Sequence, residues 1–265
     1  MQVEGNIIKM RTELADLVQY YLSFSDQEVH MNELIGQNLK FEYEGQINDI
    51  VTGELTKKSY GQGYSYKSFI TLAQCDMCIV KPETCHFAEG TCREPDWAEK
   101  HCFIPHIIYL ANTSKPKIGI TRETQVPTRW IDQGAFEALP ILKVKDRKTS
   151  GEIEVEIAKS IADKTNWRDM LKGVKKDVDL EELREDLFEE FADVLDAFDV
   201  EEIEGDVVEI NYPVDQYPEK IKSIGFDKNP VIEDKLIGIR GQYLIFENSV
   251  LNIRKHNGYY LKLTV

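Results

Sequence analysis

The spacing of apolar residues changes several times along the chain, and each spacing predicts a different kind of element. Between residues 7 and 35 the apolar positions recur at helical intervals, whereas Leu39, Phe41 and Tyr43 alternate with polar residues as in a half-buried strand. The glycine- and tyrosine-rich stretch 57–64 is typical of a loop that carries turns. We therefore predict a mixed, mostly β segment at the start of the chain.

The middle of the chain predicts a hairpin followed by a short helix. Two apolar runs, 104–110 and 117–120, flank a polar stretch at 112–116 that favours a turn. Proline is tolerated in the first turn of a helix, so Pro127 can begin one that Gly134 ends. The elements expected next are a strand at 139–145, a turn at 146–151 and a helix at 152–164.

In the last third of the chain, helical spacing gives way to strand spacing. Apolar residues from Leu180 to Phe198 form a helical stripe with a charged opposite face. Short strands are then expected at 207–212, 221–226, 236–239, 243–246, 250–253 and 259–265. Asn257-Gly258 favours a hairpin between the last two strands, and a small barrel or curled sheet suits so many short strands.

Composition indicates a globular protein of the cytoplasm. The 265 residues are 42% apolar and 30% charged, which is enough for a sizeable core. No apolar run reaches the roughly 18–20 residues of a membrane helix, and the start lacks the pattern of a signal peptide. We therefore expect no membrane partner, and in a reducing compartment clustered thiols are more often metal ligands than disulfides.

The net charge of -15 is concentrated in one segment. Residues 177–206 hold 15 acidic residues and one basic residue, so the rest of the chain carries only -1. Residues 115–150 carry eight basic and four acidic residues, which leaves room for a phosphate-binding face. The acidic segment is either a solvated helix face, a cover over that basic region, or a docking surface for a cationic protein partner.

All five cysteines lie within 28 residues, at Cys75, Cys78, Cys85, Cys92 and Cys102. Zn²⁺ takes four soft ligands in a tetrahedron, and the two-residue gap of a CxxC turn lets both thiolates face one ion. The surrounding segment is polar, and metal binding can stabilise such a segment in place of a core. We predict a structural zinc site with Cys75 and Cys78 as the first pair, completed by Cys92 and Cys102, with Cys85 as the alternative. Buried free thiols or a redox-active cysteine are the other interpretations.

Several motifs resemble an uncharacterised bacterial family that has a cysteine-rich N-terminal half before a GIY-YIG-like core. The motifs are residues 58–64, 82–86, 90–95, 128–134 and 238–244, so the resemblance covers most of the chain from about residue 45. Relatives usually carry an earlier set of four cysteines as well. The matching positions here are Asp49, Thr52, Ser65 and Ser68, and the resemblance therefore implies that this second metal site is lost.

The stretch from Ile108 to Glu156 resembles the GIY-YIG nucleases in order and spacing. This resemblance implies a three-stranded sheet with helices and a site in which Tyr109 handles the proton of a water and Arg129 holds a phosphate. Glu156 would hold Mg²⁺ or Mn²⁺ through oxygen. Lys117 stands where a tyrosine is usual, and a lysine is a poor base unless its pKa is lowered.

Around these four residues, the resemblance implies that Gly119, Thr121 and Arg122 contact nucleic acid. The leading hypothesis is thus a zinc-containing nucleic-acid-binding protein with metal-dependent phosphodiester cleavage as its activity. The alternative is an inactive scaffold that binds a protein or nucleic-acid partner. Each residue also has a structural explanation, since Tyr109 can be core, Arg129 can pair with Asp132, and Glu156 can complement a helix dipole.

Together these observations predict an α+β fold, with a zinc module, a GIY-YIG-like three-stranded sheet with helices and a small barrel-like β unit. The expected segments are 1–71 (mixed, mostly β), 72–105 (cysteine-rich metal module), 106–172 (GIY-YIG-like core), 173–206 (acidic amphipathic helix) and 207–265 (C-terminal β unit).

Overall fold

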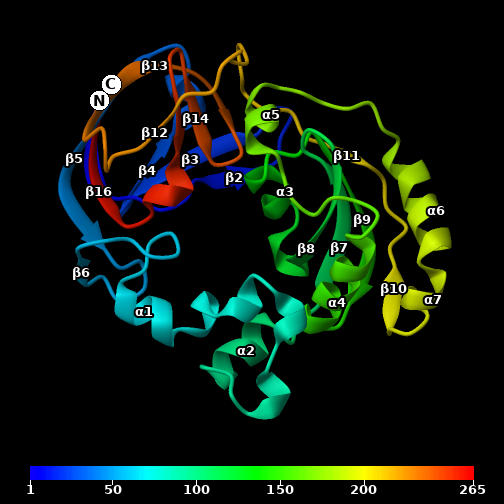
Figure 1. Ribbon diagram of the computed structural model, residues 1–265. Coiled ribbons are helices and arrows are strands. Elements are labelled where there is room, and N and C mark those ends of the chain that lie inside the picture. The colour runs from blue at the N-terminus through cyan, green and yellow to red at the C-terminus, as the bar shows by residue number, and fades with distance from the viewer. The chain divides into compact units, whose positions relative to one another are not determined.

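Two units make up the computed structural model, which describes residues 1–265 (Figure 1). The first unit combines residues 1–70, 171–173 and 211–265, and the second holds residues 71–170 and 174–210. The two ends of the chain therefore build one unit together. With 27% helix and 33% strand, the fold is the predicted mixture of α and β structure.

The larger sheet of the first unit has eight strands in the order β1-β16-β5-β13-β14-β15-β12, with β6 beside β5. Their bounds are β1 Gln2–Asn6, β5 Asn38–Asn48, β6 Leu55–Thr56, β12 Ser223–Ile224, β13 Val231–Arg240, β14 Tyr243–Phe246, β15 Val250–Asn252 and β16 Tyr259–Thr264. Strands β1 and β16 are antiparallel, so the chain ends lie side by side (Figure 1). No sheet closes into a barrel, which corrects the barrel expected at the C-terminus. The C-terminal strands instead pair with β1 and β5 from the start of the chain.

A second, three-stranded sheet replaces the helical spacing seen near the N-terminus. It consists of β2 (Arg11–Glu13), β3 (Gln19–Phe24) and β4 (Gln27–His30), and α1 (Tyr66–Thr71) follows later. In β3 the buried side chains alternate, with Tyr20 and Leu22 fully buried. Leu14 and Leu17 are 40% and 49% exposed, so the helical spacing combined exposed leucines with buried residues such as Leu22 of a strand.

The hairpin expected at Asn257-Gly258 does not form. Strand β15 pairs with β14 and β12, while β16 pairs with β1 and β5. Gly258 has a φ of +83° as the turn signal suggests, but its N–H donates to the carbonyl of Ile7 and its carbonyl accepts from the N–H of Asn48. The turn therefore leads β16 to distant strands, and tertiary pairing overrides the local preference.

The second unit is built on a five-stranded sheet in the order β10-β9-β7-β8, with β11 also beside β9. Its strands are β7 His106–Asn112, β8 Pro116–Arg122, β9 Glu137–Val144, β10 Val200–Glu202 and β11 Val208–Glu209. Its helices are α2 Pro95–His101, α3 Thr128–Asp132, α4 Arg147–Ile157, α5 Trp167–Leu171, α6 Leu180–Glu190 and α7 Ala192–Leu195. The predicted hairpin is confirmed, since β7 and β8 are antiparallel, and α3 forms after Pro127 as expected. No helix in the structure combines the length and apolar character needed to cross a bilayer.

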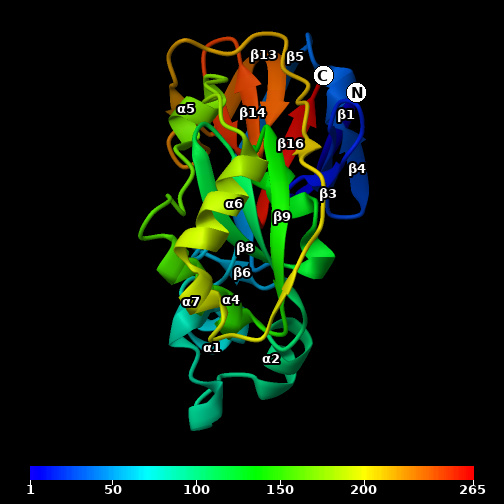
Figure 2. The ribbon, with the colours of Figure 1, turned by 90° about the vertical axis from the view of Figure 1, so that its right-hand side faces the viewer.

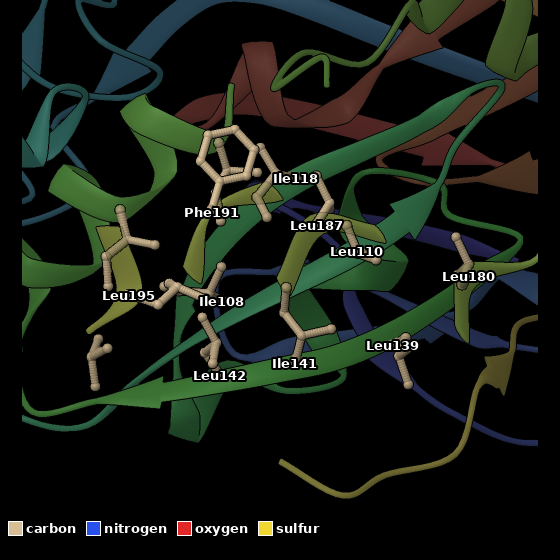
Figure 3. Close-up of a cluster of buried hydrophobic side chains, with 13 residues drawn as sticks. Ile108, Leu110, Ile118, Leu139, Ile141, Leu142, Leu180, Leu187, Phe191 and Leu195 are labelled. Carbon is tan, nitrogen blue, oxygen red and sulfur yellow. The ribbon is translucent and has the colours of Figure 1, made fainter. Parts of the chain in front are cut away.

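Helices α4 and α6 bury one face of this sheet. Figure 3 shows Ile108, Leu110 and Ile118 from the sheet facing Leu187 and Phe191, all within one cluster of buried side chains. Figure 2 shows α6 running across the sheet in front of β9. The predicted apolar stripe is thus the core-facing side, although the helix ends at Glu190 and α7 continues the stripe.

Helix α4 begins five residues earlier than the sequence predicts. Asp146 caps it by accepting a hydrogen bond from the N–H of Thr149 at 2.8 Å. Gly151 was expected to belong to a turn, but it lies inside the helix and is buried. A Cβ at this position would lie 2.5 Å from Cβ of Pro82 and 2.9 Å from the N atom of Glu83. The glycine therefore serves close packing against the cysteine segment rather than a turn.

Candidate functional site

The cysteine segment is a succession of tight turns with almost no core of its own. Four short 3-10 helices precede α2, and between residues 72 and 105 the buried residues are Ala73, Pro82 and Ala98. All five cysteines are half-buried, and no disulfide joins them. Such a segment buries too little apolar surface to hold its own shape, which is the situation in which a metal ion stabilises a fold.

Four of the five thiols surround one small cavity. Cys78, Cys85, Cys92 and Cys102 all line a space of about 20 Å³. Cys75 is absent from this lining, although its CxxC spacing had made it one of the first expected ligands. Cys85, the alternative in the sequence, is present. Cysteine sulfur is a ligand type that Zn²⁺ accepts, so these four thiols are candidate ligands.

The four thiols are close enough to interact electrostatically. Burial, followed by the charges of Asp76 and the other three thiols, raises the pKa of Cys78 to about 11. Burial also raises the pKa of Cys102, while the guanidinium of Arg147 opposes that rise. The raised pKa values mean that Cys78 and Cys102 keep their protons at neutral pH unless a cation stabilises their thiolates.

Asp76, Cys78 and His86 form a second arrangement of potential ligands, with one atom from each lying within 4.8 Å of the others. Asp76 already has other partners, since Oδ2 accepts from Nε of Arg93 at 2.9 Å and lies 3.4 Å from Nε2 of His86. Its Oδ1 accepts from the N–H of Met77 at 2.6 Å. This carboxylate is therefore better placed to orient its neighbours than to bind an ion.

The central sheet holds a second cluster, centred on Tyr109. Its ring is fully buried, and its hydroxyl accepts hydrogen bonds from Nε2 of Gln133 at 3.0 Å and from the Arg129 guanidinium. Gly119 lies directly opposite on β8, where a Cβ would come within 2.7 Å of the tyrosine hydroxyl. The glycine is needed so that the aromatic ring can lie across the neighbouring strand.

Lys117 and Glu154 complete this cluster. Lys117 is only 6% exposed, and burial together with the charge of Arg129 lowers its pKa to about 8. Burial raises the pKa of Glu154 to about 7, although Lys117 attracts the ionised carboxylate. Asp163 acts on both groups, favouring the charged lysine and disfavouring the charged glutamate. A lysine and a glutamate that both titrate near neutral pH are a common feature of functional sites.

The sequence predicted Glu156 for this position, and the structure places a different residue there. Glu156 forms an ion pair with Lys159 on the surface of α4. Glu154 and Glu156 flank the buried stripe of Ile153 and Ile157 on opposite sides of the helix. Nothing in the local pattern says which flank faces β8, so the residue could be found only from the tertiary structure.

The three residues predicted to contact nucleic acid lie on β8. Gly119 packs on Tyr109 as described, and Thr121 is 6% exposed. Arg122 is half-buried at the end of the strand, opposite His106. Its guanidinium acts on Cys102 and His106, so it lies toward the cysteine segment rather than toward Lys117.

In the first unit, the four positions that the family resemblance matched to an earlier set of cysteines also meet. The carboxylate of Asp49 is 1% exposed and accepts hydrogen bonds from the N–H groups of Thr52 at 3.0 Å and Ser65 at 2.6 Å. It also accepts from the Ser68 side chain, which lies 3.2 Å from the Ser65 hydroxyl. A hydrogen-bonded carboxylate thus holds together the loops that a metal would join.

Comparison with known proteins gives one match. The model of the family described as "Protein of unknown function (DUF2797)" matches residues 36–261. No curated protein and no solved structure matches the chain.

Proposed function

The chain belongs to the DUF2797 family, and from the geometry above we propose that it is a zinc-binding protein whose central cluster binds the phosphate groups of nucleic acid. The observation that carries the zinc proposal is the convergence of four thiols on one cavity. Zinc is the metal that four cysteines bind most commonly in structural sites. The proposed ligands are Cys78, Cys85, Cys92 and Cys102.

The surroundings of the cavity support a tetrathiolate site. Four thiolates around Zn²⁺ carry a net charge of about -2, which nearby cations must offset. Arg147 and Arg122 both interact with Cys102, and Arg93 lies beside Asp76. Nε of Arg147 is buried without a hydrogen-bond partner. A guanidinium in this position suits a neighbouring thiolate better than a neutral thiol.

Cys75 provides a matched control for the zinc proposal. We expect about one zinc per chain by elemental analysis of protein purified without chelators. Cys92→Ser should lose most of this metal, whereas Cys75→Ser, which makes the same change outside the cavity, should keep it. A metal content near zero in the unaltered protein, or equal loss in both variants, would exclude the proposed ligands.

We propose metal-dependent cleavage of phosphodiester bonds as a second function, carried out by the central cluster. A phenol, two cations and a carboxylate come together there, from Tyr109, Lys117, Arg129 and Glu154. Arg129 would neutralise a phosphate, and Glu154 would hold Mg²⁺ or Mn²⁺ through oxygen. The lowered pKa of Lys117 makes it a better proton acceptor than an ordinary lysine. This removes the main chemical objection to a lysine in place of the usual tyrosine.

The two glutamates of α4 distinguish cleavage from mere binding. With Mn²⁺ present, we expect the protein to cleave end-labelled single-stranded or duplex oligonucleotides of DNA or RNA. Glu154→Gln should reduce the rate about 100-fold or more, the size of effect seen when a group that stabilises the transition state is removed. Glu156→Gln should stay close to the unaltered protein. Binding without cleavage would favour the inactive scaffold, and the absence of both would reject the nucleic-acid proposal.

The acidic helix supports one further part of the proposal. Leu187 and Phe191 bury its apolar stripe in the core, so its acidic residues are left for solvent or for a cationic protein partner. An open hollow lined by Asp177, Asp179, Glu182 and Asp186 lies at its start. Binding of a lysine-rich peptide that disappears after Glu182→Gln and Asp186→Asn would support this partner, and unchanged binding would count against it.

A further inference from the structure

The first turn of α4 is attached to the cysteine segment. The N–H of Arg147 donates to the carbonyl of Cys102 at 2.8 Å. The side chain of Arg147 reaches in another direction, and its Nη2 donates to the carbonyl of Ile79 at 2.5 Å. One residue of α4 therefore joins two separate turns, one next to Cys78 and the other ending at Cys102.

The next turn of α4 is fitted to the same segment by shape. Gly151 lies against Pro82, where an added Cβ would be 2.5 Å from Cβ of Pro82 and 2.9 Å from the N atom of Glu83. Real Cβ atoms do not approach backbone this closely, so no side chain fits unless the segments move apart. The short 3-10 helix Pro82–Thr84 therefore sets the position of α4, and it directly precedes Cys85.

The same helix carries Glu154, three residues after Gly151. Glu154 lies on the same side of α4 as Gly151, and α4 packs against β8, the strand that carries Lys117. Helices are stiff over such a short distance, so a shift at Gly151 moves Glu154 with it.

We propose that the cysteine segment positions Glu154 beside Lys117 through α4, with Arg147 and Gly151 as the positioning residues. The inference rests on the proposed zinc site, because a bound ion would fix the turns that contact these two residues. Without the ion, the polar turns lose the interaction that orders them, and the placement of Glu154 becomes imprecise. Zinc bound at the cysteine segment would thus control how close the carboxylate of Glu154 lies to the ammonium of Lys117.

The test follows the reactivity of the Lys117 amine toward an acylating reagent as a function of pH, read by mass spectrometry. Gly151→Ala inserts a methyl group between α4 and Pro82 and leaves all four thiols unchanged. Gly205→Ala is the matched control, because its Cβ would make only an ordinary contact at 3.5 Å with Pro140. Glu154→Gln gives the profile of Lys117 without the carboxylate, and elemental analysis gives the zinc content of every sample.

We expect the Lys117 profile of zinc-loaded Gly151→Ala to shift away from that of the unaltered protein and toward that of Glu154→Gln. A shift of about 1 pH unit is the size expected for loss of a neighbouring charge. Gly205→Ala should superimpose on the unaltered protein. Removal of zinc by a chelator should shift the unaltered protein in the same direction as Gly151→Ala.

Two failures are distinguishable. A protein that never binds zinc rejects the metal site, and a protein that binds and releases zinc with no change at Lys117 rejects the coupling. If Gly151→Ala does not fold, Arg147→Gln removes the side-chain bond to Ile79 and is examined in the same way. Profiles of the folded positioning variants that coincide with that of the unaltered protein would overturn the inference.

Discussion

Replacement of Lys117 by methionine should stabilise the protein at neutral pH. Lys117 is 6% exposed, and burial is the main reason why its pKa falls from 10.5 to about 8. Methionine keeps the unbranched shape and removes the charge. Burial of an ammonium carries a desolvation penalty, which an apolar residue of similar volume avoids.

The magnitude follows from the two pKa values. A fall from 10.5 to about 8 corresponds to about 3 kcal/mol of unfavourable free energy for the charged lysine in the folded state. Glu154 loses an attractive partner in the variant, but its pKa of about 7 lets it take up a proton instead. We therefore expect a net stabilisation of about 1–3 kcal/mol at pH 7.

The sign of the pH dependence is fixed by the direction of the pKa change. Between pH 8 and 10.5 the unfolded chain binds more protons at Lys117 than the folded protein does, so this group makes stability rise with pH. Below pH 8 the full penalty is present, and above 10.5 it is gone. The advantage of the methionine variant should therefore be large at pH 7 and small at pH 10.

Urea unfolding of the unaltered protein and the variant at pH 7 and pH 10 measures this difference. Lys115→Met is the matched control, because Lys115 is exposed and lies two residues away. Tyrosines and other lysines that titrate near pH 10 act equally in all three proteins and cancel. A Lys117→Met variant that is less stable at pH 7, or whose difference is the same at both pH values, would refute this reasoning.

Three further changes test other parts of the fold. Burial alone would raise the pKa of Asp49, but its hydrogen bonds hold that pKa well below the ordinary value. The ionised carboxylate therefore stabilises the fold above about pH 4, and this stabilisation is lost as the pH falls further. Thermal unfolding between pH 5 and pH 2 should show a loss of about 2 kcal/mol that is absent in Asp49→Asn. Gly119→Ala should cost about 1–3 kcal/mol in urea unfolding, because the added methyl group overlaps the Tyr109 ring. Leu187→Ala should lower the free energy of unfolding by about 2–5 kcal/mol in the same measurement, since Leu187 is 3% exposed and lies on the core-facing side of α6.

Local patterns predicted the elements that depend on neighbouring residues. The hairpin of β7 and β8 and the helix after Pro127 follow from apolar runs, a polar turn and a proline at a first turn, all within a few residues. The amphipathic character of α6 was also predictable, because a helix with an apolar stripe and a charged face packs with the stripe toward the core.

Contacts between distant segments account for the predictions that were wrong. Gly151 was predicted to be a turn residue because its contact with Pro82, about 70 residues earlier, cannot be seen in the local sequence. Asn257-Gly258 was predicted to form a hairpin, but the backbone of Gly258 instead forms its hydrogen bonds with Asn48 and Ile7.

The same limit applied to the candidate sites. The CxxC spacing favoured Cys75, but which thiols share a cavity depends on how the turns fold back. The choice between Glu154 and Glu156 depends on which side of α4 faces β8.

The pairing of β1 and β5 with β16 also imposes an order on synthesis. Strand β5 lies between β13 and β16, both of which begin more than 180 residues after it ends. The ribosome therefore delivers all five cysteines while β5 still lacks both of these neighbours. The cysteine-bearing unit can therefore fold first, whereas the exposed edges of β5 can pair with other chains until β13 and β16 have been synthesised. Nascent chains arrested near residue 210 should already protect the thiols from alkylation when zinc is present, while β5 becomes resistant to protease only after β16 has been released.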